Sequence, residues 1–335
     1  MTVIHLLTRP SLIVGLCLSL AGPLCAEDRN ALGWLDQMGV AVERLSYRGT
    51  LIQVQGQKIE AFEVIRRVDD TGVHERIFAL NGPAREMVRR GNRTEPDFDE
   101  RPTSWIPSVV QPSLMLHQTP HQWSELTDAY EIELGGRERV AGYTAQRVNI
   151  HPKDAYRYGQ RLWLEVETGM LLKSVIVDGA GNRLGEQGFV TIELDATISD
   201  QDLQPVAPAL SVSMPHPNPV IDRPRRRGSR TAGRVVRPLW GPRELPAFFY
   251  LINAHHGRSD QDSAFDHLLF SDGLTSFSVY IDHSPDRVVN SRLEAMGPMH
   301  IFTAMRGQRQ FTIMGQVPET TVEFVARQFL APDEK

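Results

Sequence analysis

The chain has 335 residues, of which 41% are hydrophobic and 23% are charged, and its formal net charge is −5 at pH 7. This length suffices for two domains with their own cores, and the composition excludes a largely disordered chain. The net negative charge argues against a general nucleic-acid-binding protein, so nucleic acid is not an expected partner.

The N-terminal segment has the pattern of a signal peptide. Arg9 gives a weakly positive start, and the apolar run at 11–21 is too short to cross a bilayer comfortably. Small Ala26 then precedes an acidic pair, which predicts a signal peptide at residues 1–26, cleaved near Ala26. An uncleaved anchor helix and a lipid attached to Cys25 are the alternatives. Cleavage would give a periplasmic protein that has lost both of its cysteines, so its cores would have to hold without disulfides.

The first predicted element after this segment is a helix. Its apolar side chains recur at steps of three and four residues, which places them on one face. These side chains are Leu35, Met38, Val42 and Leu45, and Trp34 flanks them. Such a stripe is typical of a helix that packs on a sheet.

From residue 47 to about 200 the apolar period changes to two, which is typical of β-strands. Turn residues such as Gly56 and Gly169 recur every eight to fourteen residues, and this spacing predicts an antiparallel meander. Prolines interrupt the pattern at 100–130, where we expect short helices or helical turns that cover one face of the sheet.

Several late strands of this meander are apolar on both faces. Leu162 and Leu164 point to one face and Trp163 to the other, and Leu172 and Ile176 belong to a second such strand. A sheet that is apolar on both faces has to be covered on both. Helices supply one cover, while the other could be a closed barrel, a partner or an apolar ligand held in a curved half-barrel. The pattern does not choose between them, and these five residues are candidates for the wall of an apolar cavity.

A linker follows at 205–237, because prolines crowd its first part and arginines its second. Guanidinium groups bind phosphates and carboxylates, so the arginines are candidate contacts for an anionic lipid or an acidic partner. The candidates are Arg223, Arg225, Arg226, Arg227 and Arg230. A solvated linker without a ligand is the other interpretation.

The second domain is expected at 238–332, as a small α+β unit. Its most conspicuous stretch, "LLFSDGLTSFSVYID" at 268–282, contains Ser, Asp and Gly together. Asp272-Gly273 is a hairpin signal and the run after it alternates with period two, so we interpret it as a turn and a strand. The chain ends in a predicted helix whose apolar face carries Val322, Val325, Ala326 and Phe329.

No motif for chemistry is present in the sequence. There is no G-x-S-x-G elbow around Ser271 or Ser276, no phosphate loop and no dinucleotide fingerprint. Neighbouring His255 and His256 would point to opposite faces of a strand, and no histidine or cysteine spacing is typical of a metal site. We therefore expect no enzyme and no catalytic, cofactor-binding or metal-binding residues. The residues alone indicate a two-domain exported binding protein.

Four segments, taken together, resemble the RseB/MucB family of periplasmic regulators. They are "LSYRGTLIQVQG", "RRVDDTGVHERIFALNGPAREMVRRGN", "LLFSDGLTSFSVYID" and "FTIMGQVPETTVEFVARQ". They lie in both halves of the chain and in the order of the family. The resemblance implies an α+β protein with two domains. The first, at 27–204, would be a curved antiparallel half-barrel with helices, similar to the lipoprotein-carrier fold. The second would be a smaller C-terminal α+β domain.

The resemblance also implies a function. A protein of this family binds the periplasmic part of a transmembrane anti-sigma factor and shields it from regulated proteolysis. Lipid or lipopolysaccharide signals of envelope stress loosen the complex, and a sigma-E or AlgU type sigma factor is then released. Acyl chains would lie against the apolar face of the first domain, and the partner mainly on the second domain and the region between the domains. The resemblance carries over no catalytic residue and no cofactor.

Two other functions compete with this one. A periplasmic carrier of lipid or lipoprotein acyl chains would need the half-barrel but not the second domain. An envelope hydrolase would need a nucleophile motif, which is missing from the sequence. The oligomeric state is open, a homo-oligomer included.

Overall fold

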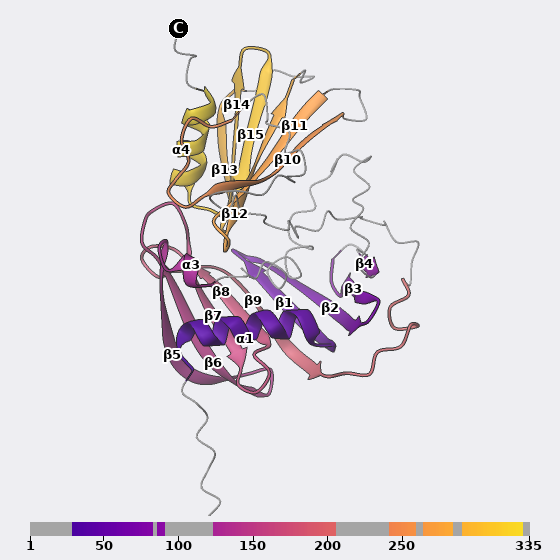
Figure 1. Ribbon diagram of the computed structural model, residues 1–335. Coiled ribbons are helices and arrows are strands. Elements are labelled where there is room, and N and C mark those ends of the chain that lie inside the picture. Colours follow the sequence, from indigo (N-terminus) through magenta and orange to yellow (C-terminus); the bar gives the residue numbers. More distant parts are fainter. Residues whose placement is uncertain are drawn as a thin grey trace, which may run out of the picture.

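The structure is a computed structural model that describes residues 29–82, 86–90, 123–205, 241–258, 264–283 and 290–330. The predicted signal peptide at 1–26 and the arginines of the predicted linker lie outside these residues. The described chain forms two antiparallel sheets, one of nine strands and one of six, each with a helix against it (Figure 1).

The first sheet is built from two meanders that meet at their ends. Its strands are β1 (Tyr47–Gln55), β2 (Lys58–Asp69), β3 (Gly72–Ala79), β4 (Glu86–Arg90), β5 (Tyr130–Val140), β6 (Tyr143–Pro152), β7 (Gly159–Glu165), β8 (Leu171–Val177) and β9 (Arg183–Leu194). The order is β4-β3-β2-β1-β9-β8-β7-β6-β5, so β1 pairs with β9 and joins the meanders. Strands β4 and β5 are edges, and the sheet is not closed into a barrel. The predicted antiparallel meander is confirmed.

Helix α1 (Ala31–Arg44) covers one face of this sheet (Figure 1). Its first turn is capped by Asn30, whose side-chain oxygen accepts a hydrogen bond of 2.8 Å from the Gly33 amide. The predicted stripe is confirmed at Leu35, Met38 and Val42, which are all buried, and Leu35 and Met38 belong to one core cluster with the sheet residues. Each fully buried side chain of this kind contributes roughly 1.5–3 kcal/mol. A short helix, α3 (Trp123–Leu126), precedes β5. The rest of the segment for which short helices are expected, up to residue 122, lies outside the described residues.

The opposite face of the first sheet is covered partly by its own chain. Ile65 of β2 packs with Ile198 and Leu203, which lie on the segment that follows β9. Further along the sheet, Trp163 lies between its cross-strand neighbours, and the Lys173 ammonium sits 4.8 Å from the centre of the indole ring. Long cationic side chains can cover apolar surface with their stems. The chain itself therefore supplies part of the cover of the second face.

The second sheet has the strand order β10-β11-β12-β15-β14-β13. The strands are β10 (Tyr250–Arg258), β11 (Ala264–Ser271), β12 (Ser276–Asp282), β13 (Arg292–Met296), β14 (Met299–Arg306) and β15 (Arg309–Gly315), followed by helix α4 (Glu319–Leu330). Helix α4 packs on β14 and β15 and buries Val322, Val325 and Phe329 against Phe311 and its neighbours (Figure 1). The predicted strand after the Asp272-Gly273 turn and the predicted last helix are both confirmed.

Candidate binding site between the two sheets

The turn between β11 and β12 is held rigid by its own side chains. The Asp272 Oδ1 atom accepts hydrogen bonds from the amides of Leu274 (2.9 Å) and Thr275 (2.8 Å). The Ser271 hydroxyl accepts from the Gly273 amide at 2.9 Å and donates to the Thr275 carbonyl at 2.8 Å. Gly273 has a φ of +100°, a conformation that glycine adopts without strain. The Ser271 hydroxyl is therefore a structural group of the turn, in agreement with the prediction from sequence.

The other oxygen of Asp272 reaches the first sheet. Its Oδ2 atom accepts a hydrogen bond of 2.7 Å from the Tyr130 hydroxyl and lies 3.2 Å from Nε of Arg157. All three side chains are buried, and burial, together with the nearby Asp272 carboxylate, raises the pKa of Tyr130 well above its ordinary value. Tyr130 therefore stays a neutral donor. Leu274, on the same turn, packs against the hydrophobic core of the first sheet, so the turn joins the two halves of the protein.

Arg157 is the centre of the contact on the side of the first sheet. It lies between β6 and β7, and its Nη2 donates a hydrogen bond of 2.6 Å to the Ala247 carbonyl. The guanidinium carbon lies 4.8 Å from the centre of the Phe249 ring, and Nη1 lies 3.4 Å from the Asp154 carboxylate. A buried guanidinium needs such partners, because an unpaired buried charge costs several kcal/mol.

Helix α4 is hydrogen-bonded to the loop that carries Arg157. The hydroxyls of Thr320 and Thr321 donate hydrogen bonds of 2.7 Å to the carbonyls of Ala155 and Tyr156, respectively. The Tyr156 ring packs edge-on against Phe324, with 5.3 Å between the ring centres. The first turn of α4 thus contacts the loop between β6 and β7 of the first sheet directly. The two halves are connected by polar contacts as well as by apolar packing.

A cleft opens beside this junction. Eight of its lining residues come from β1, β8 and β9 and two from the second half; they are Gln53, Val54, Gln55, Ser174, Ile176, Gly185, Glu186, Gln187, Pro298 and Gln316. Its empty volume, open mouth included, is about 270 Å³. The side-chain oxygen of Gln53 is buried here and has no hydrogen-bond partner among the residues that the structure describes. A buried acceptor without a partner is costly, and a bound chain with a free amide would satisfy it.

The five residues predicted to line an apolar cavity are all buried. Leu162, Trp163, Leu164 and Leu172 belong to the core of the first sheet, and Ile176 lines the cleft. Leu172 also lines a second hollow of about 200 Å³, together with Leu51, Leu171 and Phe189. Ligand pockets commonly measure roughly 300–1,000 Å³. Both volumes include open solvent, and the enclosed space of both hollows among the described residues is far below that range. An acyl chain would therefore require the core to open, and the role of these residues as a cavity wall stays a prediction.

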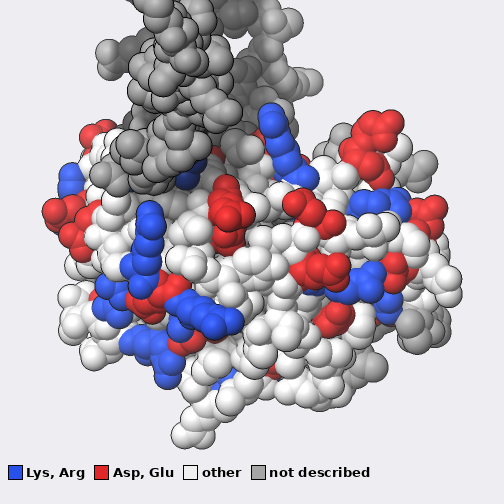
Figure 2. All heavy atoms as spheres, turned by 90° about the horizontal axis from the view of Figure 1, so that it is seen from below, with Lys and Arg blue, Asp and Glu red and all other residues white. Residues whose placement is uncertain are grey.

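The predicted arginine contacts, Arg223, Arg225, Arg226, Arg227 and Arg230, lie outside the described residues. On the described surface, acidic and basic side chains are intermixed over the lower end of the first domain (Figure 2). This arrangement produces no strong field of one sign at that end of the molecule. Sequence reasoning also missed Tyr130 and Arg157, because no spacing relates them to Asp272.

The fold and this junction define a class of protein: two antiparallel sheet domains joined by a buried polar contact, with a small cleft beside it. Comparison with known proteins identifies the family. The MucB/RseB N-terminal domain model matches residues 30–207, and the MucB/RseB C-terminal domain model matches residues 236–329. The chain belongs to the MucB/RseB family, which confirms the resemblance found in the sequence.

Relatives of known role cover nearly the whole chain. The sigma factor AlgU regulatory protein MucB of Pseudomonas aeruginosa is 26% identical over 314 residues, which are 92% of this chain and 93% of the relative. The sigma-E factor regulatory protein RseB of Escherichia coli K12 is 23% identical over 325 residues, 94% of this chain and 95% of the relative. Both names describe regulatory proteins.

Solved structures of MucB have the same fold. The crystal structure of MucB in complex with MucA(peri) matches with a TM-score of 0.65 and 26% identity, over 88% of this chain and 97% of that one. MucB crystallised by itself matches with a TM-score of 0.64 and 26% identity, over 89% of this chain and 96% of that one. Within the described residues of the present chain, no helix is both long and apolar enough to span a membrane.

Proposed function

We propose that this chain is a periplasmic regulator that binds the periplasmic part of a transmembrane anti-sigma factor and shields it from regulated proteolysis. The observation that carries this proposal is the match of the family along both halves of the chain, together with the likeness to MucB in its complex with MucA(peri). The proposal includes export, with residues 1–26 removed near Ala26, and two domains at 27–204 and 238–332 joined by the linker at 205–237.

The partner segment is proposed to bind at the cleft and the junction beside it. The cleft is lined mainly by the first sheet, while Pro298 and Gln316 reach it from the second half. A partner that enters it contacts both domains at once. The oxygen of Gln53, which has no partner within the described part of the chain, offers a hydrogen-bond acceptor to an extended chain.

Release is proposed to follow from competition. A lipid or lipopolysaccharide that binds better to the partner-free arrangement of the two domains lowers the affinity for the partner. The partner lowers the affinity for the lipid by the same factor. The acyl chains would enter the first domain between α1 and the sheet, where the candidate wall residues Leu162, Leu164 and Leu172 lie. The first domain would then act as a lipoprotein-carrier-like half-barrel that opens on binding.

Calorimetry tests this function. The exported chain is titrated with the periplasmic segment of the anti-sigma factor of its own host, with and without lipopolysaccharide. We expect saturable binding that lipopolysaccharide weakens. Lipid binding in the absence of any binding of the segment would refute the regulator and favour the alternative, a periplasmic carrier of lipid or lipoprotein acyl chains.

A further inference from the structure

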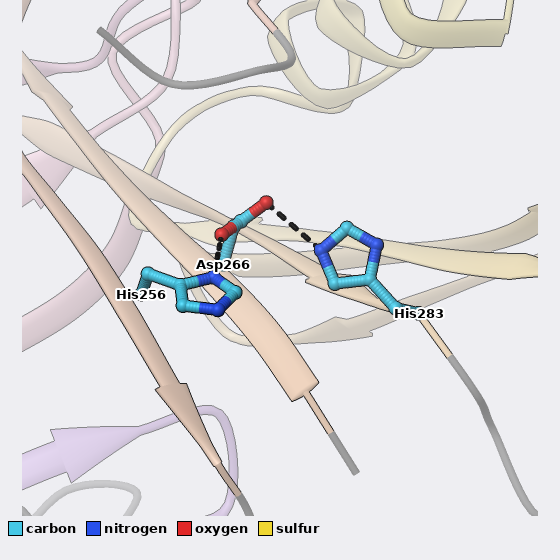
Figure 3. Close-up of side chains that lie close together, drawn as sticks. All are labelled: His256, Asp266 and His283. Carbon is cyan, nitrogen blue, oxygen red and sulfur yellow. Dashed lines mark hydrogen bonds and ion pairs between the residues drawn. The ribbon is translucent and has the colours of Figure 1, made fainter. Parts of the chain in front are cut away.

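Three side chains that could ligate a metal meet at one end of the second sheet, away from the junction between the domains. His256 of β10, Asp266 of β11 and His283, which follows β12, each direct one potential ligand atom to a common point (Figure 3). These ligand atoms all lie within 4.8 Å of one another. The cluster has no part in the contacts that join the two halves, so the proposed function leaves it unexplained.

Strand pairing brings the three residues together. His256 and Asp266 are directly opposite each other in the β10–β11 pair. Asp266 is opposite Ile281 in the β11–β12 pair, and His283 follows two residues later on the same face. The backbone amide of His283 donates a hydrogen bond of 3.0 Å to the Ala264 carbonyl, which fixes the chain at that point. The ligand atoms are therefore held on a paired scaffold.

The carboxylate of Asp266 lies between the two imidazole rings (Figure 3). Its Oδ1 is 2.6 Å from His256 Nδ1, and its Oδ2 is 2.9 Å from His283 Nε2. Asp266 is buried, whereas 61% of the His256 side chain is exposed. One side of the cluster is thus open to solvent, as a metal ion that exchanges with water requires.

We infer that His256, Asp266 and His283 form a binding site for a divalent transition metal of the Zn²⁺ type. Two imidazole nitrogens and one carboxylate oxygen are the donors that Zn²⁺ prefers when one position is left to water. Zn–N and Zn–O bonds of about 2.0–2.2 Å in a tetrahedron place ligand atoms about 3.3 Å apart. The two short contacts are made to different oxygens of Asp266, so only one of them remains a contact between two ligand atoms, and it would widen by roughly 0.4–0.7 Å. Ligand atoms as far apart as 4.8 Å would have to move closer together, which side-chain rotation of the exposed His256 can supply.

Metal binding requires a tautomer change in each histidine. The atoms that now donate to Asp266 must offer their lone pairs to the metal, and each neutral ring then carries its proton on the other nitrogen. For His256 that nitrogen belongs to an exposed side chain, so water can accept the proton's hydrogen bond. For His283 it is Nδ1, which accepts a hydrogen bond of 3.2 Å from Nε of Arg309 in the metal-free protein.

Arg309 therefore favours the metal-free form. Both its positive charge and its donated hydrogen bond oppose a cation bound at the other side of the His283 ring. Replacing it by glutamine removes the charge and supplies an oxygen that can accept from Nδ1. This contact gives the site a specific signature: loss of Arg309 should tighten metal binding, while loss of any ligand should weaken it.

The test is titration of the whole exported chain, purified without a histidine tag, with Zn²⁺ in competition with a chromophoric chelator. Co²⁺ serves as a second probe, because its visible absorption distinguishes a tetrahedral protein site from the hydrated ion. We expect one Zn²⁺ per chain, at least tenfold weaker binding in His256→Ala, and tighter binding in Arg309→Gln. His256 is chosen because its exposure makes the substitution compatible with folding.

Two matched controls accompany these variants. His151→Ala removes an exposed histidine that pairs with the Glu133 carboxylate at 3.2 Å and, among the described residues, belongs to no cluster of potential metal ligands. Arg292→Gln removes an exposed positive charge elsewhere on the same sheet. Neither substitution should change Zn²⁺ affinity. The inference is overturned if the chain binds no Zn²⁺ with saturation, or if His256→Ala binds it as tightly as the unchanged chain.

Discussion

Asp272 and Arg157 form an ion pair of 3.2 Å across the junction between the two domains, and both side chains are fully buried. The pair joins the turn between β11 and β12 to the loop between β6 and β7. Tyr130 completes it from the first sheet through its hydroxyl. The turn that the sequence predicts at Asp272-Gly273 is therefore one of the contacts that hold the two domains together.

Breaking this pair from one side should be costly. Asp272→Asn keeps a side chain that can still cap the turn but removes the buried counter-charge of Arg157, which then keeps only the partly exposed Asp154 carboxylate at 3.4 Å. Arg157→Met removes the cation that faces the buried Asp272 carboxylate. Each single change is expected to lower the free energy of unfolding by about 3–5 kcal/mol, and the double change by less than the sum. Urea denaturation followed by tryptophan fluorescence measures these values.

A control for this prediction is an exposed ion pair of the same type. Arg147 lies 2.8 Å from Glu138 on the first sheet, and both side chains are at least one third exposed. Glu138→Gln should cost less than about 1 kcal/mol. An equally small cost for Asp272→Asn would show that the buried pair does not hold the domains together.

Acid should weaken the second domain through His267. Burial, helped by neighbouring His255, lowers the pKa of His267 from 6.5 to about 4. Its ring stacks on Tyr280 with 4.3 Å between centres, and its Nε2 lies 2.9 Å from the Ser278 hydroxyl. Between about pH 6.5 and 4 the unfolded chain binds more protons than the folded one, so stability is complete above pH 6.5 and falls as the pH drops towards 4.

The size of this loss is on the order of 3 kcal/mol or less at pH 4. Thermal unfolding of His267→Phe, which keeps a ring against Tyr280 but cannot take up a proton, should show a flatter dependence on pH in this window. A His267→Phe profile as steep as that of the unchanged chain would contradict the assignment.

Glycine at position 49 is required by the pairing of β1 with β9. A Cβ atom there would lie 2.4 Å from the Thr191 carbonyl oxygen, a backbone atom that cannot move aside alone. Gly49→Ala is therefore expected to destabilise the first domain by about 1–3 kcal/mol. Gly39→Ala, in the middle of α1 with nothing within 4 Å, should instead stabilise by about 0.5–1 kcal/mol. If both substitutions shift the denaturation midpoint in the same direction, the predicted contrast between Gly49 and Gly39 is wrong.

Partner binding in the cleft can be tested with one substitution at its wall. Gln55 lines the cleft near the end of β1, and an indole ring at this position would fill part of it. Gln55→Trp should lower the affinity for the anti-sigma segment at least tenfold, or about 1.4 kcal/mol. Gln57→Trp, two residues further in the exposed turn, should have no effect. Equal affinities of the two variants, measured by calorimetry, would place the partner elsewhere.

Local pattern was enough to predict much of the fold. The stripe of α1 and the alternation of β12 could be found from sequence because each element buries one face, and burial imposes a period of 3.6 or of two on its apolar residues. The turn at Asp272-Gly273 could be found because positive φ selects glycine. The family could be identified because its motifs keep their order over the whole chain.

The interior of the first sheet was harder to predict. Apolar residues on both faces of β7 and β8 indicated a second cover, but the pattern could not show that the chain after β9 and the stem of Lys173 supply part of it. Amphipathic side chains leave no apolar period in the sequence, because one end of them is charged. Because the sequence does not show these covering side chains, its pattern predicts an apolar cavity at β7 and β8.

The sequence by itself determined the elements, the order of the two halves and the family, since these depend on periodicity, turn residues and motifs that neighbouring residues carry. Only the tertiary structure decided which distant side chains meet. Asp272 is joined to Tyr130 and Arg157 across more than a hundred residues, and His256, Asp266 and His283 are gathered by the register of three strands. Such contacts are set by strand pairing and domain packing, and no spacing along the chain records them.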